Sequence, residues 1–155
     1  GMAFGTGRHE STQLAAGLIK KIGSTSTLLD IGTGSGVLAI FAKKIGCITV
    51  ETVEIDADAR ENAAENFELN GMPGIPIYHD IIEVKQSYDV VVANILAPTI
   101  IYLKDQLLRV MKPGGHLILS GIIEPEAPQI EAAFADLKLV EKVCDKEWVG
   151  FCYQA

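Results

Sequence analysis

The sequence predicts a three-layer α/β fold, with helices on a mostly parallel sheet of about seven strands. Three observations predict it. Short apolar runs alternate along the chain with segments of helical periodicity. The valines at 90–92 form an uninterrupted apolar run, which is typical of a strand covered on both faces. An apolar strand from Leu28 leads directly into a glycine-rich turn and then a helix. A chain of 155 residues fits one domain, and we expect residues 1–155 to form it.

The first half of the chain contains two strands and three helices by this interpretation. Leu14, Leu18 and Ile22 fall on one stripe of an amphipathic helix. Gly71 follows the third helix at the position where glycine commonly ends helices. The expected elements are a helix over 12–22, a strand that starts at 28 and runs into the turn 32–36, a helix over 37–45, a strand over 47–54 and a helix over 57–70.

The sequence pattern of the second half of the chain predicts five strands and two helices. The proline and glycines of residues 112–115 are expected to stop a helix and turn the chain into the next strand. The expected elements are strands over 75–79 and 88–93, a helix that opens at Pro98 and extends through Met111, a strand over 116–120, a helix over 126–137, and a closing antiparallel pair over 139–143 and 147–153.

The glycine-rich turn is the first candidate for a binding site. Gly32, Gly34 and Gly36 follow the Gly-x-Gly-x-Gly pattern, one residue tighter than the Gly-x-Gly-x-x-Gly of dinucleotide-binding folds. We expect the glycines to let the backbone approach a ligand where a Cβ would collide. With the acid Asp30 at the end of the strand, this turn resembles the first motif of S-adenosylmethionine-dependent methyltransferases. That resemblance places Asp30 and the three glycines among the expected cofactor-binding residues.

A second candidate is Glu54, at the end of the second predicted strand. It lies 22 residues after Gly32, and an acid about 20 residues beyond such a turn binds ribose hydroxyls in doubly wound sheets. Asp56 is a rival for this role. We assign Glu54 to the ribose and Asp56 to capping the helix that begins near Ala57.

Two more polar residues stand at strand ends. Asp80 follows the third strand, where it is able to accept from an adenine amino group or to begin the following turn. Asn94 follows the buried valine strand, where an amide is either a helix cap or an active-site group; the sequence context favours the site. Ligands of such sheets bind outside the carboxyl ends of the strands, which groups these residues into one site.

Five further segments make the resemblance specific; in order, they are AFGTGRHEST (3–12), NILA (94–97), KPGG (112–115), LSGI (119–122) and EW (147–148). With them, the chain resembles the catalytic domain of the PrmA family, which methylates amino groups of ribosomal protein L11. By this resemblance the S-adenosylmethionine contacts fall on Thr12, Gly32, Glu54 and Asn94, although the family usually has Asp where Glu54 stands. The resemblance implies a Rossmann-like methyltransferase fold with an antiparallel last strand, and we expect these 155 residues to hold no counterpart of the family's N-terminal substrate-docking domain.

The resemblance also implies a mechanism, in which a substrate amine attacks the sulfonium methyl group. Asn94 and the backbone carbonyl of Ile95 are expected to accept hydrogen bonds from that amine. His9 is either a proton acceptor or a residue that orders the N-terminal loop, and we favour the second role. Phe4 and Trp148 are candidates for the pocket lining, although large aromatic residues usually belong to the core.

Composition narrows the functional class. A net charge of −7 argues against non-specific binding to nucleic acid or an anionic membrane. Three cysteines without metal-ligand spacing predict a reducing, cytoplasmic compartment and no metal site. No apolar run reaches the roughly 20 residues of a membrane span.

The main interpretation is a protein N-methyltransferase that acts on a ribosomal protein, and it has three alternatives. A small-molecule N-methyltransferase would have the same cofactor site. A non-catalytic S-adenosylmethionine-binding regulatory module would not require the amide of Asn94. A nicotinamide-dependent oxidoreductase is disfavoured by the spacing of the glycines.

Overall fold

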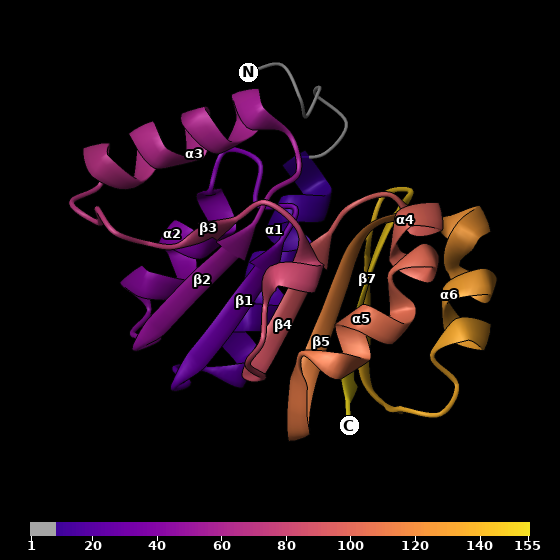
Figure 1. Ribbon diagram of the computed structural model, residues 1–155. Helices are drawn as coiled ribbons and strands as arrows, with labels where there is room; N and C mark the ends of the chain where they lie inside the picture. Colours follow the sequence, from indigo (N-terminus) through magenta and orange to yellow (C-terminus); the bar gives the residue numbers. More distant parts are fainter. Residues whose placement is uncertain (1–8) are drawn as a thin grey trace.

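The computed structural model describes residues 9–155 as a seven-stranded sheet with helices on both faces (Figure 1). The motif residues that precede His9, Phe4 among them, lie outside the described residues. The elements are α1 (His9–Ile22), β1 (Thr27–Ile31), α2 (Val37–Lys44), β2 (Thr49–Val53), α3 (Ala57–Leu69), β3 (Ile77–Tyr78), η3 (Ile81–Glu83), β4 (Tyr88–Asn94), α4 (Ala97–Tyr102), α5 (Lys104–Arg109), β5 (Met111–Ile123), η4 (Glu124–Glu126), α6 (Ala127–Ala133), β6 (Lys138–Asp145) and β7 (Trp148–Gln154).

The sheet confirms the predicted α/β class and topology. Its strand order is β3-β2-β1-β4-β5-β7-β6. Strands β1 to β5 pair in parallel, and β7 is antiparallel to both of its neighbours. The chain direction of the crossovers reverses between β1 and β4, and such a switch point is where doubly wound sheets bind ligands.

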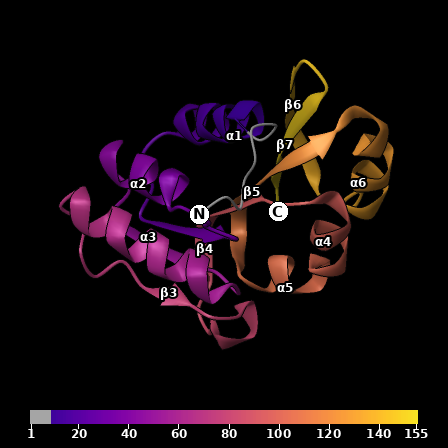
Figure 2. The same ribbon diagram turned by 90° about the horizontal axis from the view of Figure 1, so that it is seen from above.

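Two hydrophobic cores sandwich the sheet. One lies under α1, α2 and α3, and the other lies under α4, α5 and α6 (Figure 2). The valine run of β4 serves both, since Val90 and Val92 join the first core and Val91 joins the second. This alternation explains why the strand is apolar without interruption. No helix within residues 9–155 is long and apolar enough to cross a membrane.

The single helix predicted from Pro98 through Met111 is wrong, because the chain is not one continuous helix there. The segment from Pro98 to Met111 forms two short helices, α4 and α5, that meet at Leu103. Leu103 leaves the helical region (φ −88°, ψ 4°), and the bend keeps both Ile100 and Leu107 fully buried against the sheet. Met111 already belongs to β5, where it pairs with Tyr88.

The strand that follows begins five residues earlier than predicted. Its register against β4 shifts between Tyr88 and Val90, and residues 112–115 lie within this irregular stretch. Gly115 packs closely here, because a Cβ on it would lie 2.9 Å from the carbonyl oxygen of Lys112. Helix α6 is also shorter than the predicted 126–137: residue 126 belongs to the separate turn η4, and the helix ends at Ala133.

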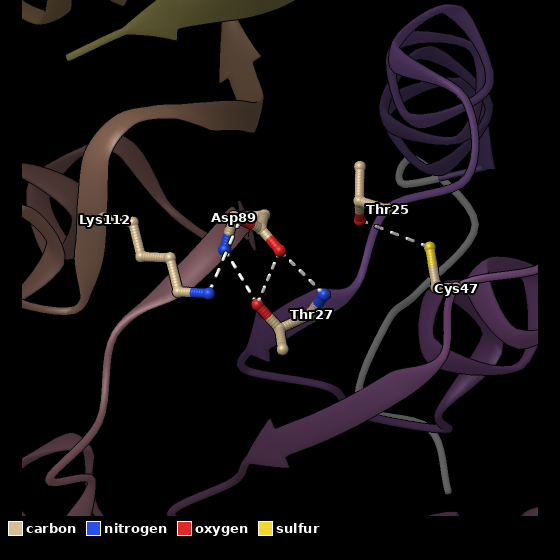
Figure 3. A network of polar contacts seen from close by, with 5 residues as sticks. All are labelled: Thr25, Thr27, Cys47, Asp89 and Lys112. Atoms are coloured by element: carbon tan, nitrogen blue, oxygen red, sulfur yellow. Dashed lines mark hydrogen bonds and ion pairs between the residues drawn. The ribbon is translucent and has the colours of Figure 1, made fainter.

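A polar network aligns the amino ends of β1 and β4 (Figure 3). Oδ2 of Asp89 accepts bonds from the amide and the hydroxyl of Thr27, both at 3.0 Å. The ammonium of Lys112 lies 3.6 Å from Oδ1 of Asp89. Partial burial acts to raise the pKa of Asp89, but the Thr27 bonds and the Lys112 charge outweigh it and hold that pKa below its usual value. This network anchors the two central strands at the edge opposite the glycine turn.

Candidate functional site

The glycine turn joins β1 to α2 at the carboxyl edge of the sheet. Gly32, Gly34 and Gly36 all have positive φ values, of 72°, 57° and 86°. A Cβ on Gly32 would lie 2.5 Å from Cγ2 of Ile95, and one on Gly36 would lie 2.5 Å from Cε1 of Phe67. These two glycines are therefore required by the protein's own side chains, and the close approach of a ligand to the turn stays a prediction.

Glu54 connects the glycine turn to the start of α3. Its Oε1 accepts from the amide of Gly34 at 2.9 Å, and its Oε2 accepts from the amide of Asp56 at 3.0 Å. Arg60 donates to the carbonyl oxygen of Glu54 at 3.0 Å. These bonds hold the half-buried carboxylate beside the turn, and each of its oxygens has a further lone pair for another donor.

The rival carboxylate, Asp56, caps α3 as predicted. Its Oδ2 accepts from the amide of Ala59 at 2.8 Å, and its backbone is extended at the N-cap position. The two nearby acids therefore have separate roles in the structure, one at the turn and one at the helix.

Asp30 is buried beneath the turn, with 1% of its surface exposed. Its Oδ2 accepts from the hydroxyl of Thr33 at 2.7 Å. Burial raises the pKa of Asp30 to about 7; the Thr33 bond lowers it and the charge of Glu54 raises it further. Asp30 thus orders the inner side of the turn and titrates near neutrality.

A cavity of about 720 Å³ opens at this edge, within the size range of small-molecule sites. Its lining is mostly apolar, and its charged side chains are all acids: Glu54, Asp80 and Asp105. Among residues 9–155, no Lys, Arg or His lines the cavity. Such a lining favours a neutral or cationic ligand over a phosphorylated one. The lining is formed by Ile31, Gly32, Val53, Glu54, Ile55, Asp80, Ile81, Ile82, Ile95, Thr99, Tyr102, Leu103, Asp105 and Gln106.

Asp80 lies at the cavity wall and also caps η3. Its Oδ1 accepts from the amide of Ile82 at 3.1 Å, and Glu83 reaches back to the amide of His79 at 2.9 Å. The turn-forming alternative from the sequence is therefore present in the structure. A carboxylate has about four acceptor positions, so this bond leaves the adenine alternative open.

Asn94 and Thr12 meet above the sheet, although 82 residues separate them. The Nδ2 group of Asn94 donates to Oγ1 of Thr12 at 3.1 Å, and Asn94 is only 7% exposed. Thr12 belongs to the first turn of α1, and Asn94 is the last residue of β4. The structure thus brings together two of the residues that the resemblance implies as cofactor contacts.

The remaining sequence candidates are more peripheral. His9 is exposed at the first residue of α1, and Trp148 is partly buried at the start of β7. Neither residue lines the cavity.

Other residues of the site were not predicted from the sequence. Ile55 and Ile82 are 73% and 59% exposed at the cavity wall. Each follows closely on a strand-end acid, and this position is the sequence signal that indicates them. The α4–α5 side of the wall, with Thr99, Tyr102 and Gln106, carried no comparable signal.

Known proteins match this chain over its whole length. A family model described as "Ribosomal protein L11 methyltransferase (PrmA)" matches residues 1–155. The ribosomal protein L11 methyltransferase of Campylobacter concisus (strain 13826) is 40% identical over 155 residues, which cover 99% of this chain and 56% of that protein. The Geobacter metallireducens protein of the same name is 38% identical, over 100% of this chain and 52% of that protein. The chain therefore spans about half the length of these relatives.

Solved structures confirm the expected Rossmann-like methyltransferase fold. A crystal structure of ribosomal protein L11 methylase from Lactobacillus delbrueckii subsp. bulgaricus superposes with a TM-score of 0.91 at 35% identity, over 95% of this chain and 79% of that one. The M. jannaschii tRNA m1G37 methyltransferase has a TM-score of 0.76 at 18% identity, over 92% of this chain and 48% of that one, a likeness of fold alone. The match over the whole sequence identifies this chain as a member of the ribosomal protein L11 methyltransferase (PrmA) family.

Proposed function

We propose that the chain binds S-adenosylmethionine at the carboxyl edge of the sheet and transfers its methyl group to an amino group of a protein. The observation that carries this proposal is the charge of the cavity, whose lining, in the part of the chain that the structure describes, has three acids and no basic side chain. A phosphate-free adenosine derivative with a cationic sulfur suits such a lining. A nicotinamide dinucleotide, with its two phosphates, does not.

The residues present fit this cofactor in detail. Glu54 is positioned to accept from both ribose hydroxyls, since each of its oxygens retains a free acceptor position beyond its backbone partner. Asp80, Ile55 and Ile82 line the part of the cavity that suits the adenine ring. When bound, S-adenosylmethionine supplies a methyl group on a positively charged sulfur.

The contribution of the protein is orientation and exclusion of water. We assign to the Asn94 amide and the Ile95 carbonyl the binding of the acceptor amine. Alignment of this kind is worth roughly 7–11 kcal/mol of an activation barrier. The amine must be neutral to attack, and an α-amine with a pKa near 7.7–8.0 is neutral far more often at pH 7 than a lysine with a pKa near 10.4.

His9 has an open role in this scheme. Its exposed position at the start of α1 suits a residue that orders the preceding segment better than a buried proton acceptor. A shift in the pH–rate profile of His9→Ala would identify it as the base. A weaker cofactor affinity without such a shift would support the ordering role.

We further propose ribosomal protein L11 as the acceptor, since the family and the relatives at 35–41% identity carry that name. We place the reaction in the cytoplasm, where the free thiols of Cys47, Cys144 and Cys152 are stable. By itself, the 155-residue chain captures L11 only at its free concentration, so we expect slow methylation far from saturation. Fusion to the unmatched part of a longer relative should raise kcat/KM.

Calorimetry and mass spectrometry test the proposal. Titration of the chain with S-adenosylmethionine and with S-adenosylhomocysteine should show one site per chain, whereas NAD should not bind. Incubation with L11 and the methyl donor should add the mass of one methylene per transferred methyl. Failure of both adenosine ligands to bind the folded chain would refute the cofactor assignment. Cofactor binding without methylation of L11, even by the fused protein, would redirect the proposal to a small-molecule amine.

A further inference from the structure

The last residue of β4 and its neighbour on β5 hold consecutive residues of α1. Asn94 and Ser120 are directly paired in the parallel register of these strands. Asn94 donates to the side chain of Thr12 at 3.1 Å, and Ser120 donates through Oγ to the carbonyl oxygen of Ser11 at 2.7 Å. Ser11 and Ser120 are fully buried. Two neighbouring strands thus bind two neighbouring residues of the same helical turn.

The sheet geometry explains why both bonds reach the same helix. Residues paired in register on parallel strands point to the same face, and alternate residues along a strand share a face. Val92 and Ile118, two positions before Asn94 and Ser120, both belong to the core beneath α1. The two polar side chains therefore continue apolar rows that already pack against that helix.

The two bonds differ in what they hold. The bond from Ser120 ends on a main-chain oxygen and so locates the backbone of the first turn of α1. The apolar contacts of Ala15, Leu18 and Ile19 lie further along the helix, and apolar packing has no directional preference. A buried hydrogen bond of good length is directional. Ser120 thus sets the position of the turn from which Thr12 reaches Asn94.

A third contact at this turn is weaker. The ammonium of Lys146, in the turn between β6 and β7, lies 3.2 Å from Oε2 of Glu10. This pair is exposed, and exposed ion pairs contribute little to stability. The buried bond from Ser120 is the stronger of the two restraints.

We propose that Ser120 is a positioning residue for methyl transfer: by holding the carbonyl of Ser11, it places Thr12 so that the amide of Asn94 is oriented toward the acceptor amine. This inference rests on the proposed function for its catalytic consequence. Its structural part, the dependence of the Asn94 amide on Ser120, stands apart from any activity. Ser120 itself does not touch the reacting atoms in this assignment.

The test compares Ser120→Ala with a matched control, Thr52→Val. The hydroxyl of Thr52 is also fully buried and also donates to a backbone carbonyl, that of Pro76 at 2.8 Å, but on the β2–β3 side of the sheet. Both variants lose one buried bond of the same kind. A third variant, Ser120→Cys, restores a weak donor at the original position.

Two measurements are made on the three variants. The first is the side-chain amide signal of Asn94 in ¹⁵N-resolved NMR spectra of the ligand-free protein, identified by its loss in Asn94→Asp. The second is kcat at saturating methyl donor together with the calorimetric affinity for that donor. We expect Ser120→Ala to shift the Asn94 signal and to lower kcat between about 10-fold and 100-fold, with a smaller change in affinity. Ser120→Cys should recover part of both effects, and Thr52→Val should show neither.

Equal losses of Tm in Ser120→Ala and Thr52→Val, with the Asn94 signal and kcat alike in the two, would overturn the proposal and leave Ser120 a structural residue. If the wild-type chain binds the methyl donor but methylates no acceptor, the proposed function fails while the NMR comparison still decides the positioning of Asn94. An unmoved Asn94 signal in Ser120→Ala refutes the inference in either case.

Discussion

The carboxylate of Glu54 accepts a hydrogen bond from the amide of Gly34 at 2.9 Å, and this contact joins the second strand of the sheet to the turn that follows the first. The second oxygen of Glu54 accepts from the amide of Asp56 at 3.0 Å. One side chain therefore supports the glycine turn and also presents its remaining lone pairs to the cavity.

Replacement of Glu54 by Ala should weaken S-adenosylmethionine binding by about 1.5–3 kcal/mol per lost charge-assisted bond. Glu54→Asp, the residue usual in the family, keeps the charge on a shorter arm and should bind more tightly than Glu54→Ala. Titration calorimetry measures both. Asp56→Ala is the control: loss of the cap should cost about 1 kcal/mol of stability but leave the affinity unchanged. Equal affinities for the wild type and Glu54→Ala would contradict the assignment.

Gly32→Ala should destabilise the chain more than Gly71→Ala does. Both glycines have a positive φ, of 72° and 70°, so each substitution carries about 1–2 kcal/mol of backbone strain. Only at Gly32 does the new methyl group meet another side chain, Cγ2 of Ile95 at 2.5 Å, whereas nothing lies within 4 Å at Gly71. Urea unfolding of both variants isolates the cost of the clash. Ile95→Ala removes the atom that the new methyl group would meet, so it should cost less stability in the Gly32→Ala background than in the wild type. Purely additive losses of stability in the double variant would argue against the clash.

Asn94→Ala should lower kcat much more than it weakens cofactor affinity, because its amide is assigned to the acceptor amine. Single-turnover kinetics and calorimetry on the same preparation compare the two quantities. The loss of the bond to Thr12 also affects stability, so Thr12→Val serves as the control that removes this bond while retaining the amide. A fall in affinity with kcat unchanged at saturation would make Asn94 a cofactor ligand only.

Asp30→Asn should change how stability depends on pH. The pKa of Asp30 is about 7 in the folded chain, above the roughly 3.9 of an unfolded Asp, so between these values the folded state binds more protons than the unfolded state. The contribution of Asp30 to the free energy of unfolding therefore falls as the pH rises from about 4 to about 7 and is constant above that range. Asn removes this slope, so the variant should gain stability relative to the wild type by roughly 2–4 kcal/mol across that range.

Urea unfolding between pH 4 and pH 8 measures this difference. Asn keeps an oxygen that accepts from Thr33, so the comparison isolates the charge. Asp89→Asn provides the opposite case at lower pH: the folded pKa of Asp89 is lowered, so its contribution is present above the unfolded value of about 3.9 and is lost as the pH falls through the folded value, and for this variant the measurements extend below pH 4. Parallel pH profiles for Asp30→Asn and the wild type would show that Asp30 is ionised throughout.

The sequence by itself determined the features that depend on near neighbours. The alternation of strand and helix patterns predicted the class of fold, and the apolar run of β4 predicted a strand covered on both faces. The glycine turn and the cap at Asp56 are identified from residues within a few positions of one another, and Glu54 from its place at a strand end 22 residues after Gly32. Local backbone preference and side-chain chemistry decide such features before the chain is folded.

Only the tertiary structure decided which distant residues meet. Thr12 contacts Asn94 across 82 positions, and Ser11 contacts Ser120 across 109, because the sheet order places β4 beside β5 under α1. The bend at Leu103 likewise arises where two short helices must both pack on one sheet. The apolar pattern of the segment predicts a single helix. Periodicity reports which side of a segment is buried, but not the neighbour that covers it; strand order and register supply that information, and they exist only in the folded chain.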